Sequence, residues 1–297
     1  MDRAGSTMAV FSHDVELLPA VGAALNLAGI RIVPQPELGA IHLMHFGESI
    51  GIIPDPEGLP ALYVASPIDP KALVAAIRTA HELNETRRAV REAKELLEIA
   101  RLLGSEHNRN KLYSTIVLKA REMTKADAGT LFVIESGDGK EDVLRFAIAQ
   151  TGPHHKETYA GGTLPMSNKS IAGNVAMNGK PFRLDDVYKD AAARMLNFDR
   201  SFDEKNGYRT KSMLVVPLMS YTGSPIGVLQ LMNRKPMFEM PLNSVSITES
   251  AVEPFDKHDE ELITALAAHA GLALRNAQLL EDLWTTKGLE GKNPLER

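Results

Sequence analysis

The stretch Pro225-Ile-Gly-Val-Leu-Gln-Leu-Met232 is followed directly by Asn233-Arg234, and the chain then reaches Phe255 and Asp259-Glu260 at the start of a long apolar helical pattern. The first stretch has the length and apolar content of a β-strand. A basic side chain leaving a strand and a carboxylate entering a helix can form an ion pair. We therefore expect the arginine and the aspartate to tie this strand to the final helix.

Three further strand-like runs surround this strand and complete a sheet. Residues 128–134 and 143–149 read as one hairpin, and residues 212–219 read as the hairpin partner of 225–232. A helical face precedes the first hairpin, a helical segment separates the two hairpins, and the last helix carries apolar residues from 262 to 277. This order predicts an α/β (α+β) fold, in which an antiparallel sheet has helices on one side and a pocket on the other.

Three segments of residues 108–281, taken in order, resemble the GAF domain family. The first two are Ser170-Ile-Ala-Gly-Asn-Val-Ala-Met-Asn-Gly-Lys-Pro-Phe182 and Phe202-Asp-Glu-Lys-Asn-Gly-Tyr-Arg-Thr-Lys-Ser-Met-Leu-Val-Val-Pro-Leu218. The third is the strand from Ile226 to Arg234. Together with Phe255 and Asp259-Glu260, it is similar to the N-K…F-x-x-x-D-E signature of cyclic-nucleotide-binding members, with Arg in place of the Lys. The resemblance implies a regulatory GAF domain that binds cAMP or cGMP and has no catalytic residues.

The resemblance, matched residue by residue, implies a ligand pocket. A phosphate would lie at the N-terminus of a helix capped by Ser167 or Asn168, because the first backbone N–H groups of a helix favour an anion. Side chains such as Asp203, Thr210 and Gln230 would read the purine edge and the ribose through directed hydrogen bonds. The implied ligand-binding residues are Thr130, Ser170, Ile171, Ala172, Asp203, Asn206, Thr210 and Gln230.

The signature residues have a structural role in the family, so the resemblance implies a lock and not a ligand contact. The basic residue and the aspartate would hold a strand to the last helix and support the pocket from behind. The insertion between them, residues 235–254, is longer than in most of the family. The implied lock residues are Asn233, Arg234, Phe255, Asp259 and Glu260.

Residues 1–80 form a smaller region in which strand-like and helix-like runs alternate, a pattern that predicts a parallel sheet. Residues 65–78 resemble the end of a response-regulator receiver domain. Receivers have an acidic pair after the first strand and a Lys before the turn Pro, where this chain has only Asp14 and Ser66. Phosphoryl transfer needs those groups to hold Mg²⁺ and to neutralise charge. We therefore expect a degenerate, truncated receiver-like domain that accepts no phosphate; an unrelated small α/β cap is the alternative.

A continuous helical pattern follows Pro70, and within it Leu83, Val90 and Leu97 recur every seven residues. Such a narrow apolar seam is typical of a parallel coiled coil. We expect residues 81–107 to be a helical linker that joins two copies of the chain into a homodimer. A single helix packed along its own domain is the alternative.

Composition argues against several other classes of protein. The 297 residues carry a formal net charge of −5 and include no cysteine. The charge gives no reason to expect a nucleic-acid or membrane partner, and the missing thiols exclude disulfides and thiolate metal sites. The N-terminus lacks the basic and apolar regions of a signal peptide. We expect a cytoplasmic protein without a metal site, a catalytic site or a cofactor other than its ligand.

These features predict a non-catalytic signalling sensor. A receiver-like domain and a dimer helix would precede the GAF domain, and residues 282–297 would end the last helix and pass the signal to a downstream partner. Two alternatives stay open. The chain could be the regulatory half of a cyclase or of a cyclic-di-nucleotide phosphodiesterase, or a ligand-free GAF dimerisation scaffold.

Overall fold

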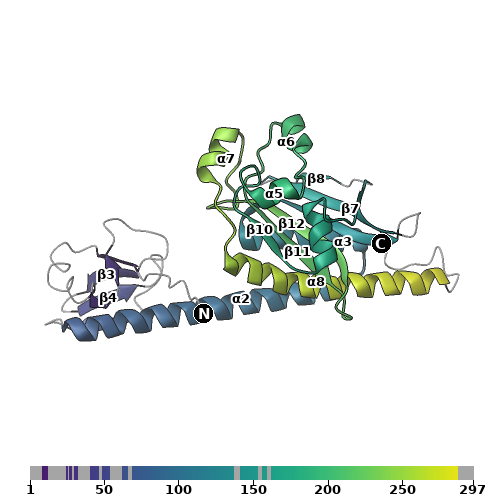
Figure 1. Ribbon diagram of the computed structural model, residues 1–297. Helices are drawn as coiled ribbons and strands as arrows, with labels where there is room; N and C mark the ends of the chain where they lie inside the picture. The colour runs from purple at the N-terminus through teal and green to yellow at the C-terminus, as the bar shows by residue number, and fades with distance from the viewer. Residues whose placement is uncertain are drawn as a thin grey trace. The chain divides into compact units, whose positions relative to one another are not determined.

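The structure is a computed structural model of the chain (Figure 1). It describes residues 9–12, 25, 27, 28, 30–32, 41–46, 49–53, 62–65, 69–136, 141–152, 156–158 and 162–286. The chain divides into two compact units, residues 1–95 and residues 96–297.

The first unit contains a five-stranded sheet with the strand order β2-β1-β3-β4-β5. Its strands are β1 (Ala9–Ser12), β2 (Arg31–Ile32), β3 (Ile41–Phe46), β4 (Ser49–Ile53) and β5 (Leu62–Ala65). Strand β1 is parallel to β2 and β3, but β4 is antiparallel to both β3 and β5. The prediction of a wholly parallel sheet is therefore wrong. Two residues separate β3 from β4, and a parallel crossover needs a dozen or more. The receiver-like assignment stays a prediction, because Asp14 and Ser66 lie outside the described residues.

The predicted linker helix is α2 (Pro70–Ser105), which begins in the first unit and ends in the second. Its last turns bury Ile99 and Leu103. The predicted seam is exposed, since Val90 is 63% and Leu97 is 62% accessible. One chain alone therefore leaves these two seam residues uncovered.

The second unit is an antiparallel sheet flanked by helices, as the sequence predicts. The strand order is β10-β11-β12-β6-β7-β8, and β9 also pairs with β7. The strands are β6 (Ala126–Ser136), β7 (Asp142–Thr151), β8 (Lys156–Thr158), β9 (Thr163–Pro165), β10 (Phe182–Leu184), β11 (Met213–Met219) and β12 (Pro225–Arg234). The helices are α3 (Arg109–Thr124), α4 (Ile171–Asn178), α5 (Ala191–Met195), α6 (Ser201–Asn206), α7 (Val245–Ala251) and α8 (Lys257–Thr286).

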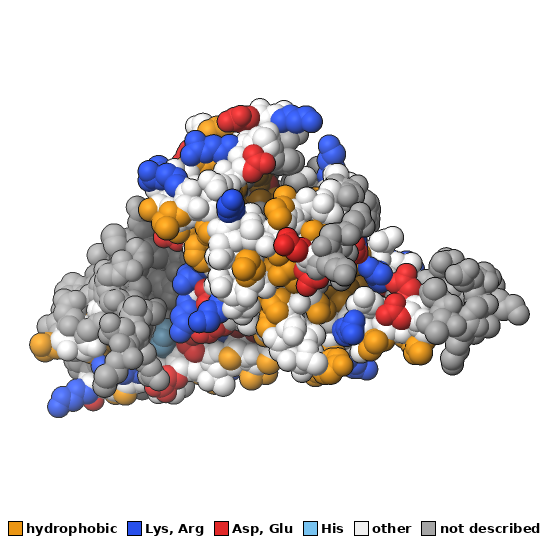
Figure 2. Space-filling view, turned by 45° about the vertical axis from the view of Figure 1, so that its right-hand side comes forward, with side chains coloured by type: hydrophobic (Ala, Val, Ile, Leu, Met, Phe, Trp, Pro, Cys, Tyr) orange, Lys and Arg blue, Asp and Glu red, His pale blue; other side chains and the backbone are white. Residues whose placement is uncertain are grey.

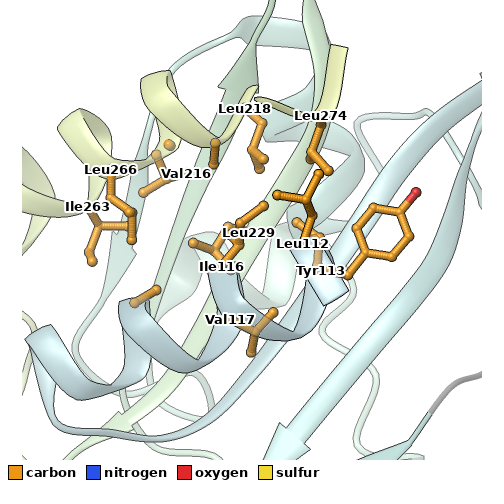
Figure 3. Packing of buried hydrophobic residues seen from close by; sticks show 14 of the residues in the cluster. Leu112, Tyr113, Ile116, Val117, Val216, Leu218, Leu229, Ile263, Leu266 and Leu274 are labelled. Atoms are coloured by element: carbon orange, nitrogen blue, oxygen red, sulfur yellow. The ribbon is translucent and has the colours of Figure 1, made fainter. Parts of the chain in front are cut away.

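One face of this sheet packs against α3 and α8. Figure 3 shows Ile116 of α3, Leu229 of β12 and Leu266 of α8 in one buried cluster. All three side chains are fully buried. Apolar residues at i, i+4 and i+5 along α3 form the stripe that a helix needs to cover a sheet. This cluster is the main hydrophobic core of the second unit.

The opposite face is covered by α4 and α5, and Figure 1 shows α5 and α6 across the sheet from α8. Successive strand residues point to opposite faces. Val228 of β12 accordingly belongs to the cluster under α4, whereas Leu229 belongs to the cluster under α8. Polar residues that share the register of Val228 lie on the α4 face, which is the face of the predicted pocket.

Basic and acidic side chains are mixed over the face of the molecule that Figure 2 shows. No helix in the described part of the chain has the length and apolar character needed to cross a membrane.

Candidate functional site

The strand β12 ends in the ion pair that the sequence predicts. Arg234 Nε lies 3.0 Å from Asp259 Oδ2, and a second guanidinium nitrogen of Arg234 pairs with Glu253. The Nε proton has no aligned acceptor, so the contact with Asp259 is a close ion pair and not a directed hydrogen bond. The strand end and the start of α8 are therefore joined by charge, with Glu253 as an additional partner.

Asp259 also shapes the start of α8. Its carboxylate accepts from the N–H of Asp256 at 2.9 Å, and the Asp256 carboxylate accepts from the N–H of Asp259 at the same distance. This reciprocal exchange satisfies N–H groups that a helix start leaves unpaired. Burial raises the pKa of the Asp259 carboxyl, and the Asp256 N–H and the charge of Arg234 only partly offset this effect. Asp259 thus fixes both the helix start and the strand.

The other two lock residues near α8 contact β10 and the core. Glu260 pairs with Arg183 of β10 at 2.6 Å, and Arg183 also donates to the carbonyl of Phe255 at 3.1 Å. The Phe255 side chain is 1% exposed and belongs to the cluster under α8. A second strand, β10, is thereby fastened to the same helix start.

Asn233 holds a different segment, residues 208–211. Its backbone has a φ of 60° and its side chain is fully buried. The amide oxygen accepts from the N–H of Lys211 at 2.7 Å, and the amide nitrogen donates to the Tyr208 hydroxyl and to the Arg209 carbonyl at 3.0 and 2.8 Å. Asparagine tolerates the left-handed conformation better than most residues. Asn233 is thus the residue that attaches the 208–211 segment to the end of β12.

Two of the predicted pocket residues, Thr130 of β6 and Gln230 of β12, lie directly opposite each other in the sheet. They share the face of Val228 and Phe132, which belong to the cluster under α4. Among the described residues, the Gln230 side-chain amide makes one hydrogen bond, a donation to the sulfur of Met232 at 3.7 Å. Thioether sulfur is a weak acceptor. The structure therefore leaves most of the hydrogen-bonding capacity of Gln230 uncommitted.

The helix near the predicted phosphate position starts later than expected. Helix α4 begins at Ile171, and its cap is Ser170, whose hydroxyl accepts from the N–H of Gly173 at 3.0 Å. The expectation that Ser167 or Asn168 caps it is wrong, because Ser170 adopts the extended conformation of an N-cap. Ile171 and Ala172 are buried in the cluster under α4. Ser170 is therefore committed to the helix, and a ligand at this end would meet backbone N–H groups.

Asp203 and Thr210 are brought together, but they bind each other. The Asp203 carboxylate accepts from the Thr210 N–H at 2.7 Å, from the Thr210 hydroxyl at 2.8 Å and from the Tyr188 hydroxyl at 2.9 Å. Asp203 is 3% and Thr210 is 2% exposed. Asn206 is the last residue of the same helix, α6. Three protein donors thus already contact the Asp203 carboxylate, and a direct contact of Asp203 with a ligand stays a prediction.

Sequence reasoning missed the aromatic residue at the centre of this group. The Tyr188 ring lies between the guanidinium groups of Arg209, at 3.9 Å, and Arg200, at 4.2 Å. Burial and the hydrogen bond to Asp203 raise the pKa of the Tyr188 hydroxyl to about 12. The hydroxyl therefore stays protonated and donates to Asp203 at any ordinary pH. No local motif predicts this stack, because Tyr188, Arg200 and Arg209 come from separate segments of the chain.

A buried ion pair was also missed. Lys235 Nζ lies 3.0 Å from Asp127 Oδ1, and the two side chains are 0% and 4% exposed. The Tyr208 hydroxyl donates to the other carboxylate oxygen of Asp127 at 2.7 Å, and Lys235 also donates to the Met240 carbonyl at 2.8 Å. Burial raises the pKa of the Tyr208 hydroxyl well above its usual value. The sequence signal for this pair is that two basic residues, Arg234 and Lys235, follow Asn233 at the strand end. Each of them could have been expected to have its own acidic partner.

The described residues contain no group of three or more His, Asp or Glu side chains that could hold a metal ion.

Comparison with known proteins agrees with this geometry. A family model of the GAF domain matches residues 108–274. The cGMP-specific 3',5'-cyclic phosphodiesterase of Drosophila mojavensis is 28% identical over 209 residues, which cover 68% of this chain and 17% of the relative. The dual 3',5'-cyclic-AMP and -GMP phosphodiesterase 11 of Drosophila melanogaster is 28% identical over 204 residues, which cover 64% of this chain and 12% of the relative. The chain thus spans less than a fifth of the length of either relative.

Among solved structures, the GAF domain of a phosphoenolpyruvate-protein phosphotransferase from Coxiella burnetii is similar with a TM-score of 0.48 and 17% identity. It covers 65% of this chain and 98% of the other. Since the family model spans residues 108–274 of 297, the chain belongs to the GAF domain family.

Proposed function

We propose that the GAF domain of this protein, within residues 108–281, is a non-catalytic sensor that binds a cyclic nucleotide. The observation that carries the proposal is that four of the implied ligand-binding residues lie on or against one face of the sheet. Thr130 and Gln230 lie opposite each other there, beside the cluster that contains Ile171 and Ala172 of α4. The likeness to cGMP-specific and dual-specificity phosphodiesterases supports a cyclic nucleotide as the ligand.

The chemistry of this face suits such a ligand. The N-terminus of α4 favours an anionic phosphate through its backbone N–H groups and helix dipole. The apolar cluster under α4 provides a surface for a planar base. The amide of Gln230 offers both a donor and an acceptor to a purine edge. Asp203 also holds Thr210 and Tyr188 in place through its oxygens.

Calorimetric titration of the chain with cAMP, cGMP and cyclic dinucleotides tests this function. We expect one of them to bind, and we expect Gln230→Ala to weaken its binding by roughly 1–3 kcal/mol, about five- to a hundred-fold, because a ligand polar group loses its partner. The matched control is Gln278→Ala on α8, whose side chain is exposed and accepts from Arg275. The control should bind like wild type. If no cyclic nucleotide gives heat, a ligand-free GAF dimerisation scaffold replaces the sensor.

We also propose that the chain forms a parallel homodimer through α2. Its support is the seven-residue spacing of Leu83, Val90 and Leu97, two of which are more than 60% exposed in one chain. Replacing all three by Lys would place like charges in the seam and should give monomers. Light scattering checks the molar mass, and a wild type that is already monomeric at tens of micromolar would refute the proposal.

The wider setting follows from these two proposals. We propose that the protein works in the cytoplasm and passes its ligand state through the dimer helices to a downstream partner. The phosphodiesterase relatives favour one other setting, in which this chain is the regulatory half of an enzyme of cyclic-nucleotide metabolism, such as a cyclase or a cyclic-di-nucleotide phosphodiesterase. Residues 1–80 would then be a receiver-like domain that accepts no phosphate.

A further inference from the structure

The insertion between β12 and α8 is an ordered strap attached at both ends. At its start, Lys235 is held by Asp127 and donates to Met240. At its end, Glu253 donates its N–H to the Arg234 carbonyl at 3.0 Å and pairs with the Arg234 side chain. Between these anchors lies α7, whose N-cap Ser244 accepts from the N–H of Ile247. We name residues 235–253 the strap.

Helix α7 of the strap contacts the 208–211 segment through two cations. Glu249 Oε1 lies 2.8 Å from Arg209 Nε, and Arg209 is 8% exposed. The Lys211 ammonium donates to the carbonyls of Glu249 and Val252 at 2.7 and 3.0 Å. A cation at a helix C-terminus satisfies carbonyls that have no partner within the helix. The position of α7 is thus tied to Arg209 and Lys211.

The residue between those two cations, Thr210, is one of the implied ligand-binding residues. Thr210 donates its N–H and its hydroxyl to Asp203 of α6, and Tyr208 donates to Asp127 of β6. Thr210 is thus linked to α6, while its neighbours Arg209 and Lys211 are linked to α7. Because the three residues are consecutive in the chain, we expect a displacement of Arg209 to reach the Thr210 backbone.

A second connection runs through side chains alone. The same Arg209 that binds Glu249 also binds Asp186 Oδ1 at 2.7 Å and stacks on the Tyr188 ring. Burial opposes ionisation of Asp186, but the hydrogen bonds from Arg209 and Lys189 outweigh it and lower the pKa of that carboxyl. Tyr188 in turn donates to Asp203. Arg209 is therefore the branch point between the strap and the residues that hold α6.

We infer that Glu249 is a positioning residue for the candidate ligand site, acting through Arg209 on Thr210 and Asp203, so that the strap sets the affinity of the site. The expected effect of Glu249 on ligand affinity rests on the proposed function. Its expected effect on the structure of residues 203–212 does not. Because coupling between two sites is reciprocal, a ligand in the pocket must also change the stability of α7.

The test compares Glu249→Ala with Glu239→Ala in the full chain. Both substitutions remove one glutamate from the strap, and Glu239 is exposed with no ion pair within the described residues. Hydrogen exchange without ligand is measured over residues 203–212. We expect roughly five- to tenfold faster exchange of the Thr210 amide in Glu249→Ala, because losing a charge-assisted contact raises local opening by about that factor. Glu249→Gln keeps an acceptor and should show a smaller change. Glu239→Ala should match wild type.

Three further results bear on the inference. Acceleration confined to α7 itself, with residues 203–212 unchanged in Glu249→Ala, would overturn it, because the helix would then be merely loosened. With cGMP as the probe, Glu249→Ala should bind roughly five- to tenfold more weakly at an unchanged melting temperature. If wild type binds no cyclic nucleotide, the proposed function fails, and the ligand-free exchange comparison still decides the role of Glu249.

Discussion

Replacing Lys235 with Met should lower the free energy of unfolding of the second unit by about 3–5 kcal/mol, since removal of one partner of a buried ion pair strands the other charge. Lys235 is fully buried against Asp127, which is itself almost fully buried. The Tyr208 hydroxyl, which also contacts Asp127, carries no charge. Arg121, which donates to the Asp127 backbone carbonyl at 2.9 Å, would then be the nearby cation. Urea denaturation followed by circular dichroism measures the effect. A loss of this size is a large share of the stability of a domain.

Lys257→Met provides the matched control for this prediction. The Lys257 side chain is 79% exposed, and its ion pair among the described residues is with Glu261, one helical turn away. Exposed pairs of this kind contribute about 0–1 kcal/mol, so the control should unfold close to wild type. Equal urea midpoints for Lys235→Met and Lys257→Met would mean that the buried pair contributes nothing to the fold.

Gly271→Ala adds a single methyl group to α8, and this addition should strongly destabilise the second unit. A Cβ at this position would come within 2.3 Å of the Met219 carbonyl oxygen of β11, which is a backbone atom and cannot move without the strand. Overpacking of this kind costs about 3 kcal/mol, and the better helix propensity of Ala recovers about 1 kcal/mol of it. We expect a net loss of about 2 kcal/mol and a melting temperature about 6 °C lower.

Gly104→Ala is the control for the helix-propensity part of that effect. Gly104 lies in α2, and nothing lies within 4 Å of the place where a Cβ would be added. The substitution should therefore be neutral or stabilise by up to about 1 kcal/mol. A melting curve for Gly271→Ala at or above that of wild type would show that α8 can move away from β11 at no cost.

The close contact at Gly271 also bears on the proposed signal. Helix α8 touches β11 and β12 through its buried face, and its start is held by the Arg234–Asp259 pair. A ligand that shifts the sheet face near Gln230 would therefore act on a helix with two fixed points, one ionic and one steric. This arrangement favours transmission by displacement of the whole helix over bending near its start.

Local regularities explain what could be predicted from the sequence. Four strands of the second unit, β6, β7, β11 and β12, follow from runs of seven or eight residues. Arg234 and Asp259 were paired because a signature places one at a strand end and the other at a helix start. Each of these inferences needs only spacing along the chain or a motif.

The predictions failed where a short stretch of sequence is compatible with more than one strand pairing or more than one helix cap. No strand is predicted at residues 49–53, so the antiparallel hairpin that β4 forms with β3 was missed. Ser170 and its neighbours Ser167 and Asn168 are all acceptable N-caps, and only the backbone conformation at Ser170 selects it.

The amino-acid sequence by itself determined the family, the order of elements in the GAF domain and the residues of its lock, because these depend on periodicity and on motifs within short stretches. Only the tertiary structure decided which partners the buried polar side chains bind. Asp127 and Lys235 are 108 residues apart in the chain, and Asp203 could have faced a ligand as readily as Thr210. A buried polar group must find a partner, and which partner it finds depends on the packing of segments that no local pattern brings together.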